Sequence, residues 1–262
     1  MSLGIKQGVA EASPPAVPPL PASVPPAIGP EETGIVGLTP GPVDDVGVGH
    51  LHPSNVTSLL GSNWRSSPIL HASWLRSIAL PIYIGPNGDH WGWLINGWLI
   101  PNGSGPIAVG RDATFSMVQA DRGLYSFPVL EVRPDGWFRF QYTPAGSAWA
   151  HTAHLNVGAL SLTIEPWEEQ IQEAYQVEFR KHGLSQPLRS VPRGSGSLRS
   201  LVVPNSLIRP LEVQGDWVRV QVVQPVRGCT PLPGSTTDEG WMRWRDTRQT
   251  LLVWFSTEDG CE

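Results

Sequence analysis

The sequence predicts an all-β protein that consists of two small β-barrels in tandem, joined by one short helix. Two observations carry this prediction. Glycine and proline are frequent, with 28 and 27 among 262 residues, whereas only 16% of the residues are charged, and this composition favours strands and turns over helical bundles. The landmarks of the first half of the chain also recur, in the same order, in the second half.

Two hairpins are the clearest local elements of the first half. In residues 91–100 an Asn-Gly pair lies between apolar and aromatic runs, and a type I′ turn needs positive φ at both of its central positions. Residues 126–132 and 137–142 predict a second hairpin, because the Pro-Asp-Gly sequence between them supplies a tight turn.

The second half repeats this layout. Trp-Phe-Arg-Phe-Gln at residues 137–141 matches Trp-Val-Arg-Val-Gln at residues 217–221 position for position. Three further pairs of segments correspond in the same order: 80–88 with 186–194, 127–132 with 207–213, and the segment around Trp149 with 240–244. Each half also ends in an apolar run, at residues 159–164 and 250–255, which we interpret as closing strands. Four landmarks in one order indicate a duplicated unit.

The connecting helix is expected at residues 166–175. A proline lies near its start, Glu168 and Glu169 occupy the first turn, and apolar residues follow at helical spacing. Residues 58–61 and 69–80 are expected to contain one more short helix.

A proline-rich segment precedes the two units. Residues 11–45 contain ten prolines and no aromatic residue, so they bury too little apolar surface to offset their ordering entropy. They are expected to form a spacer that populates the polyproline II conformation. Pro-Pro-Leu-Pro at residues 18–21 is also a sequence that a proline-binding groove recognises, and self-association through the barrels of the chain is an alternative role.

The repeated unit resembles the bacterial Src-homology-3 (SH3) domain family. Gln-Gly-Asp-Trp-Val-Arg-Val at residues 214–220, followed by Gly-Trp-Met at 240–242, is similar to the pattern of this family. The first unit departs from it, because Asp-Gly precedes Trp137, an alanine precedes Trp149, and an insertion containing residues 91–100 separates its landmarks. The resemblance implies two five-stranded SH3-like barrels, each with one buried tryptophan, Trp137 or Trp217. It also implies binding of cell-wall peptides or of a neighbouring domain, without catalysis.

This reading divides the chain into four parts. They are a proline-rich tether, disordered or extended, at residues 1–53; a first SH3-like barrel with a long insertion at 54–165; a connecting helix and linker at 166–183; and a second SH3-like barrel at 184–262.

Charge and cysteine content restrict the partners and the compartment. The net charge is −5 and the basic residues are scattered, so nucleic acid is not expected as a partner. No apolar run is long enough to span a membrane. Cys229 and Cys261 have neither metal-site nor redox-motif spacing; they either pair in an oxidising compartment or are unrelated thiols. The tether predicts an extracytoplasmic protein that is secreted, periplasmic or anchored to the surface as a lipoprotein.

The sequence offers no convincing catalytic or metal-binding set. Neither cysteine has the surroundings of a nucleophile. Two histidine pairs, His50 with His52 (near Asp44 and Asp45) and His151 with His154, are interpreted as incidental, because the first lies in a segment expected to be flexible and the second would face opposite sides of a strand. The acids at positions 165, 168, 169 and 173 are interpreted as favourable charges near a helix start. We therefore expect no enzyme activity, no metal and no cofactor.

Aromatic residues are the remaining candidates for ligand contact. Trp91 and Trp93 lie two apart on a predicted strand and would share a face that stacks on a sugar or holds a peptide. The candidate ligand-binding residues are Tyr83, Trp91, Trp93, Trp98 and Trp241; packing against the connecting helix is the alternative for the tryptophans of the insertion. The expected function is a noncatalytic cell-envelope module that binds cell-wall peptide or glycan. The alternatives are an adaptor that binds another envelope protein, and an accessory part of a cell-wall hydrolase.

Overall fold

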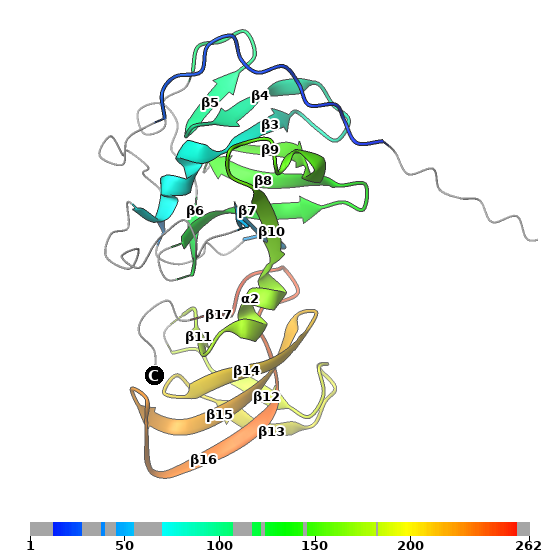
Figure 1. Ribbon diagram of the computed structural model, residues 1–262. Coiled ribbons are helices and arrows are strands. Elements are labelled where there is room, and N and C mark those ends of the chain that lie inside the picture. The colour runs from blue at the N-terminus through cyan, green and yellow to red at the C-terminus, as the bar shows by residue number, and fades with distance from the viewer. Residues whose placement is uncertain are drawn as a thin grey trace, which may run out of the picture.

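The protein is predominantly β, as expected, with two antiparallel sheets and one α-helix among the residues that the structure describes (Figure 1). This computed structural model describes residues 13–27, 38–39, 46–54, 70–106, 117–121, 124–143, 146–181 and 183–255. Figure 1 shows the first sheet and the second sheet as two units, one above the other, with β10 and α2 leading from one to the other.

The first sheet contains ten strands, and two 3-10 helices accompany it. The strands are β1 (Leu38–Thr39), β2 (Gly49–Pro53), β3 (Ala79–Tyr83), β4 (His90–Ile95), β5 (Trp98–Pro101), β6 (Met117–Asp121), β7 (Leu124–Val132), β8 (Trp137–Thr143), β9 (Gly146–His151) and β10 (Leu162–Pro166); the 3-10 helices are η3 (Leu70–Ser77) and η4 (Thr152–His154). Its main path runs β1-β6-β7-β8-β9-β3-β4-β5, and β2 pairs with both β7 and β10.

The second sheet contains seven strands and follows the helix α2 (Trp167–Glu173). The strands are β11 (Val177–Phe179), β12 (Gln186–Arg189), β13 (Leu198–Val202), β14 (Leu207–Gln214), β15 (Trp217–Arg227), β16 (Thr230–Arg243) and β17 (Val253–Phe255). Their order is β13-β12-β16-β15-β14-β11-β17.

The strand pairing follows the repeat seen in the sequence. The order β7-β8-β9-β3-β4 in the first sheet corresponds to β14-β15-β16-β12-β13 in the second. Tyr83 of β3 pairs with Trp149 of β9, and the aligned Arg189 of β12 pairs with Trp241 of β16. The pairing also shifts register at aligned positions, between residues 82 and 83 in β3 and between 188 and 189 in β12.

The two tryptophans that open the repeated β8 and β15 strands are both buried, at 2% exposure for Trp137 and 9% for Trp217. Trp137 pairs with His151 across the ladder, and the equivalent partner of Trp217 is Arg243, whose guanidinium lies over its ring. The two sites therefore share backbone register but differ in their neighbouring side chains.

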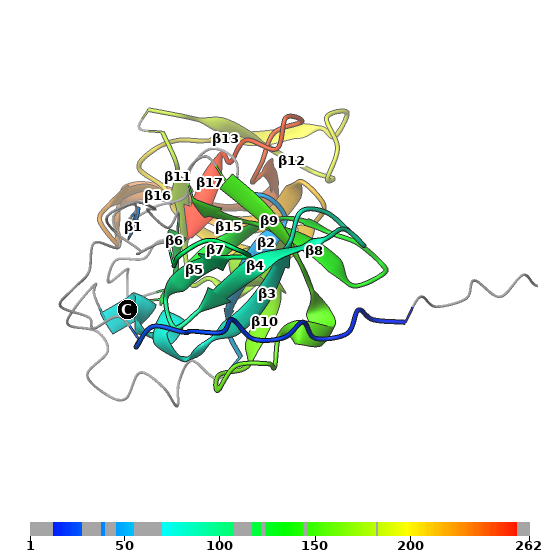
Figure 2. The ribbon, with the colours of Figure 1, turned by 90° about the horizontal axis from the view of Figure 1, so that it is seen from above.

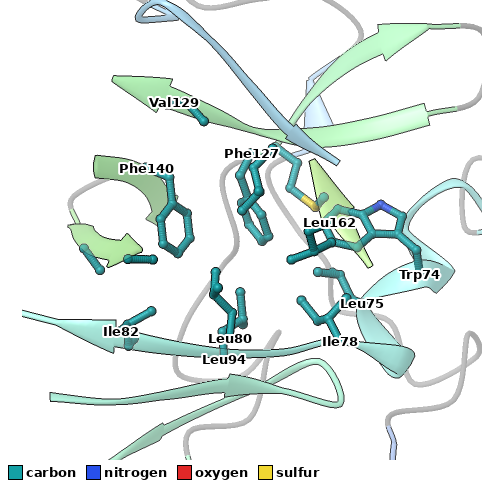
Figure 3. Packing of buried hydrophobic residues seen from close by; sticks show 14 of the residues in the cluster. Trp74, Leu75, Ile78, Leu80, Ile82, Leu94, Phe127, Val129, Phe140 and Leu162 are labelled. Carbon is teal, nitrogen blue, oxygen red and sulfur yellow. The ribbon is translucent and has the colours of Figure 1, made fainter. Parts of the chain in front are cut away.

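Each sheet has its own hydrophobic core. In the first unit, Phe127 and Phe140 face Leu80 and Ile82 across the interior (Figure 3). Trp74 and Leu75 of η3, with Ile78 directly after it, close one side of this core. In the second unit, the apolar side chains of β14, β15 and β17 pack against Trp167 and Ile171 of α2. The same cluster includes Val118 and Ala120 of β6, so the two units contact each other beside α2.

Several elements differ from the expectation. The tether was expected to reach residue 53, but β2 is a paired strand with Leu51 fully buried in the first core. The connecting helix ends at Glu173, and β11 follows it within the expected linker. The closing strand of the first unit, β10, pairs with β2. Of the other expected helix, residues 70–77 form η3, whereas residues 58–61 lie outside the described part of the chain.

Candidate peptide-binding groove

The proline-rich segment at residues 13–27 lies across the first unit. In Figures 1 and 2 this segment, drawn in blue, runs over the end of the first unit that is farther from the second sheet. It forms neither helix nor strand. The expectation of an extended conformation agrees with this segment, but it packs on the fold, as the contacts below show.

The segment presents every third side chain to the protein. Pro15, Pro18, Pro21 and Val24 are half-buried, together with Pro25, while the residues between them are exposed. The exposed fractions of Val17 and Leu20, for example, are 53% and 60%. Three residues is the repeat of the polyproline II helix, so one edge of such a helix faces the sheet.

Three ring N–H groups of the first unit hold the backbone of the segment. His154 Nε2 donates to the carbonyl oxygen of Pro15 at 2.9 Å, Trp93 Nε1 to that of Pro19 at 3.2 Å, and Trp98 Nε1 to that of Pro26 at 2.9 Å. Proline has no N–H and polyproline II has no internal hydrogen bonds, so these carbonyl oxygens need donors from outside the segment.

The floor of the groove is the outer face of the β3–β5 strands. Ala79, Trp93, Ile95 and Ile100 form a small apolar cluster there, and Val24 packs against it. Since side chains alternate across a strand, Leu80 and Leu94 point to the main core on the opposite face. These strands are therefore apolar on both faces, and the proline-rich segment covers the outer one.

A recess remains beside the docked segment. Val17 and Leu20 form one wall, Trp93 and Ile95 line it from β4, and residues 157–159 complete it. The side chains of the segment that border this recess are exposed. The recess has a volume of about 440 Å³, so it has room for a further side chain.

A buried aromatic cluster supports one end of the groove. Tyr83 packs edge-on against Trp137, with ring centroids 5.0 Å apart, and lies beside His90 and His154. Burial lowers the pKa of His154 below its ordinary value of 6.5, although the hydrogen bond to Pro15 acts in the opposite direction. Burial also lowers the pKa of His90 and raises the pKa of the Tyr83 hydroxyl. His154 is therefore neutral at pH 7, and its Nε2 carries the proton that Pro15 accepts.

The five expected ligand-binding residues separate into four groups, of which Trp91 alone packs against the main core. Trp93 and Trp98 contact the proline-rich segment directly. Tyr83 lies behind them, in the aromatic cluster. Trp241 belongs to the second sheet, where it pairs with Arg189.

Trp91 does not share the face of Trp93, contrary to the expectation. Ile82 pairs with Gly92 and Tyr83 with His90, so Trp91 is an extra residue in a β-bulge. A bulge interrupts the alternation of side chains along a strand. Trp91 accordingly packs against the main core, whereas Trp93 lies in the outer apolar cluster.

His154 is the residue of the candidate groove that the sequence analysis did not identify. The expectation that His151 and His154 face opposite sides of a strand is wrong, because the strand ends at His151 and η4 begins at the next residue. Their rings lie 5.9 Å apart. His151 has a structural role, since its Nε2 donates to the carbonyl of Asp135 and its Nδ1 accepts from the N–H of Ala153. The spacing of the prolines at 15, 18 and 21 was the available signal for the occupant of the groove.

A second polar cluster lies on the other side of the first unit. His50, His52 and Glu165 meet on the ladder of β2 and β10, and the expectation that the two histidines lie in a flexible segment is wrong, because β2 is paired on both sides. Burial lowers the pKa of His50, and the neighbouring imidazoles of His50 and then His52 lower the pKa of Glu165 to about 2. Glu165 is thus a carboxylate at neutral pH.

No protein-family model matches the chain, and no curated protein matches it significantly. Among the described residues, no helix is long and apolar enough to cross a membrane.

Proposed function

We propose that this chain is a noncatalytic binding module of the bacterial cell envelope, built from two SH3-like units, whose groove on β3–β5 binds an extended, proline-rich polypeptide. The observation that carries the proposal is the docking of residues 13–27 in that groove. Carbonyl oxygens of the segment accept from ring N–H groups, and one side chain in three contacts the floor. Aromatic grooves that recognise polyproline II peptides use the same two features.

The repeated strand order supports the assignment to SH3-like units. Five strands are arranged alike in both sheets, and the aligned residues pair with aligned partners. The pairing in the second sheet runs from β13 to β17, and these two end strands do not pair with each other in the described part of the chain. The SH3-like assignment therefore rests on the order of the strands and on the sequence landmarks.

Cys229 supports the extracytoplasmic location. It is disulfide-bonded, and Cys261, the only other cysteine of the chain, lies outside the described residues. Disulfides persist in oxidising compartments and are rare in reducing ones.

The geometry favours a protein ligand over a cell-wall glycan. The hydrogen bonds of the groove reach main-chain carbonyls at three points along an extended chain, from Pro15 to Pro26. An adaptor that holds the proline-rich segment of an envelope protein would use these contacts unchanged. Cell-wall peptide remains the competing ligand class, and the experiment below includes it.

Competition between the attached segment and a free peptide tests the proposal. The peptide of residues 13–27 is titrated, with intrinsic tryptophan fluorescence as the readout, into full-length wild-type protein and into the full-length Val24→Asp variant, which has its own segment released. We expect saturable binding to the variant and much weaker binding to the wild type. A peptide with aspartate at the positions of Pro18, Pro21 and Val24 is the control.

Two outcomes would reject parts of this proposal. If the folded variant does not bind the peptide, the groove is only an intramolecular packing surface. If the protein sediments with purified peptidoglycan and the peptide of residues 13–27 does not release it, a wall component is the ligand of a different surface.

A further inference from the structure

We propose that His50, His52 and Glu165 bind one divalent transition-metal ion, with zinc as the best-matched metal. This site is distinct from the peptide groove and does not depend on the proposed function. One ligand atom from each of the three residues lies within 4.8 Å of the others. Two imidazoles and one carboxylate are a ligand set that zinc and related divalent metals accept.

Strand pairing places the three side chains on one face. His50 and His52 are two residues apart on β2, so they point to the same side, and Glu165 of β10 is the direct partner of His50. Leu51, between the histidines, points into the main core instead. The register of one antiparallel ladder thus brings the three side chains together, and no loop has to move.

The distances between the ligand atoms suit one shared ion. Glu165 Oε2 lies 3.5 Å from His50 Nε2 and 3.0 Å from His52 Nε2. Ligands at about 2.0 to 2.2 Å from a tetrahedral zinc ion are about 3.3 to 3.6 Å from each other. The separation from His50 lies within this range, and the separation from His52 is slightly shorter.

The histidine nitrogens lack other partners. His50 is fully buried and His52 is 8% exposed, yet apart from the nearby Glu165 carboxylate His50 Nε2 and both ring nitrogens of His52 have no well-aligned hydrogen bond. A buried polar atom without a partner is costly, and a metal ion at this position would provide one for each Nε2.

The groups behind the ligands match those around bound metals. His50 Nδ1 lies 3.0 Å from Ser126 Oγ, and this contact orients the ring with Nε2 toward Glu165. The His50 ring is stacked between His52 and Trp167, each with its centroid 4.5 Å away. Because the two imidazoles are nearly parallel, the less buried His52 ring has to turn edge-on to bring its Nε2 lone pair onto the ion.

Glu165 is the open side of the site, since its side chain is 27% exposed. An ion can enter there, and water can occupy the fourth position. Gln170 of α2 also lies beside His50, and its Oε1 is buried without a hydrogen-bond partner. The metal would connect β2 and β10 directly before α2, where the first unit leads into the second.

Metal uptake by full-length protein without a histidine tag tests this inference. The protein is treated with EDTA and then titrated with Co²⁺, followed by visible absorption, and with Zn²⁺, followed by calorimetry. We expect one ion per chain with a Kd of about 1 μM or tighter, and a rise in Tm on zinc binding. Glu165→Gln and His52→Asn should each weaken binding by about tenfold or more.

The control is Glu173→Gln, which removes the same charge from an exposed position of α2 and should bind zinc as the wild type does. Two results would overturn the inference. One is that wild-type protein takes up no Co²⁺ or Zn²⁺ at about 1 mM, a measurement that needs no variant to fold. The other is that Glu165→Gln, folded by circular dichroism, binds as tightly as Glu173→Gln does, which would place the ion at other histidines.

Discussion

The indole Nε1 of Trp93 donates a hydrogen bond to the carbonyl oxygen of Pro19, 74 positions earlier in the chain, at 3.2 Å. Trp93 is buried at 1% exposure, and its N–H is the polar tip of an otherwise apolar groove floor. A buried indole N–H requires an acceptor. The proline-rich segment supplies it, so the segment is part of the folded first unit as well as its occupant.

Removing one indole donor should loosen the segment without reshaping the groove. Trp98→Phe keeps an aromatic ring but loses the N–H that Pro26 accepts, at a cost of about 1 kcal/mol in docking free energy. Cleavage by proteinase K within residues 13–27 should then be about fivefold faster. Trp241→Phe, in the second sheet, is the control and should leave the rate unchanged. Equal rates for all three proteins would contradict the docking.

A charge on the contact edge should release the segment. Val24 packs against the outer apolar cluster, whereas the adjacent Ser23 is exposed. Val24→Asp would place a carboxylate without a partner against the apolar cluster, which should destabilise the docked segment. Acrylamide should quench the total tryptophan fluorescence more strongly in Val24→Asp than in the matched Ser23→Asp, because release of the segment exposes Trp98. If both variants are quenched alike, the contact of every third side chain with the groove does not contribute to the docking free energy of the segment.

A methyl group at Gly92 should disturb the floor of the groove. A Cβ there would lie 2.3 Å from the carbonyl oxygen of Ile100 and 2.8 Å from the Cα of Pro101, both on the paired strand β5. Gly92→Ala should lower the free energy of unfolding by about 1 to 3 kcal/mol in urea denaturation. Gly85→Ala, where nothing lies within 4 Å, should change it by less than about 0.5 kcal/mol.

Acidification should weaken the first unit. Burial lowers the pKa of both His90 and His154 in the folded state, so the unfolded chain binds protons at these positions that the folded chain does not. Their contribution to stability is complete above the unfolded value of 6.5 and decreases as the pH falls below it toward the folded pKa. The free energy of unfolding should therefore be lower at pH 5.5 than at pH 7.5. His154→Gln should reduce this difference, and an unchanged pH dependence would show that His154 is protonated alike in both states.

Reduction should destabilise the second unit. Cys229 is disulfide-bonded and lies in the turn between β15 and β16. A closed span of about 30 residues contributes roughly 3 to 4 kcal/mol in the chain-entropy model. Dithiothreitol should lower the midpoint of unfolding followed by intrinsic tryptophan fluorescence, and a nonreducing peptide map should join Cys229 to Cys261. A thiol that reacts with iodoacetamide in the native protein would contradict this.

The hairpins and the repeat were predictable because local chemistry determines them. Asn96 and Gly97 both adopt positive φ in the turn between β4 and β5, as the Asn-Gly pair requires. The alignment of residues 80–83 with 186–189 is matched by equivalent strand pairs. The residues that specify a hairpin or a repeated strand thus lie within that hairpin or strand.

The groove and the cluster of His50, His52 and Glu165 depend on contacts that the sequence does not display. Trp93 meets Pro19 only after the hairpin places it on the outer face, and the bulge at Trp91 shifts the pattern of that strand. His50 and Glu165 are 115 positions apart, and only the register of β2 with β10 makes them neighbours. The composition of the proline-rich segment predicted a tether because its small side chains bury little area. In the structure the segment is held instead by ring N–H groups that donate to its carbonyl oxygens.

The attachment of the proline-rich segment to its own groove sets a threshold for every other ligand. A tethered occupant acts at an effective concentration on the order of millimolar. Under the proposed function, a free peptide that makes the same contacts must approach that concentration before it fills half of the grooves, so weak encounters with proline-rich proteins would be rejected. A ligand whose side chain also fills the recess beside Val17 and Leu20 would exceed the threshold at lower concentration, and the chain would then respond selectively, releasing its N-terminal segment as it binds.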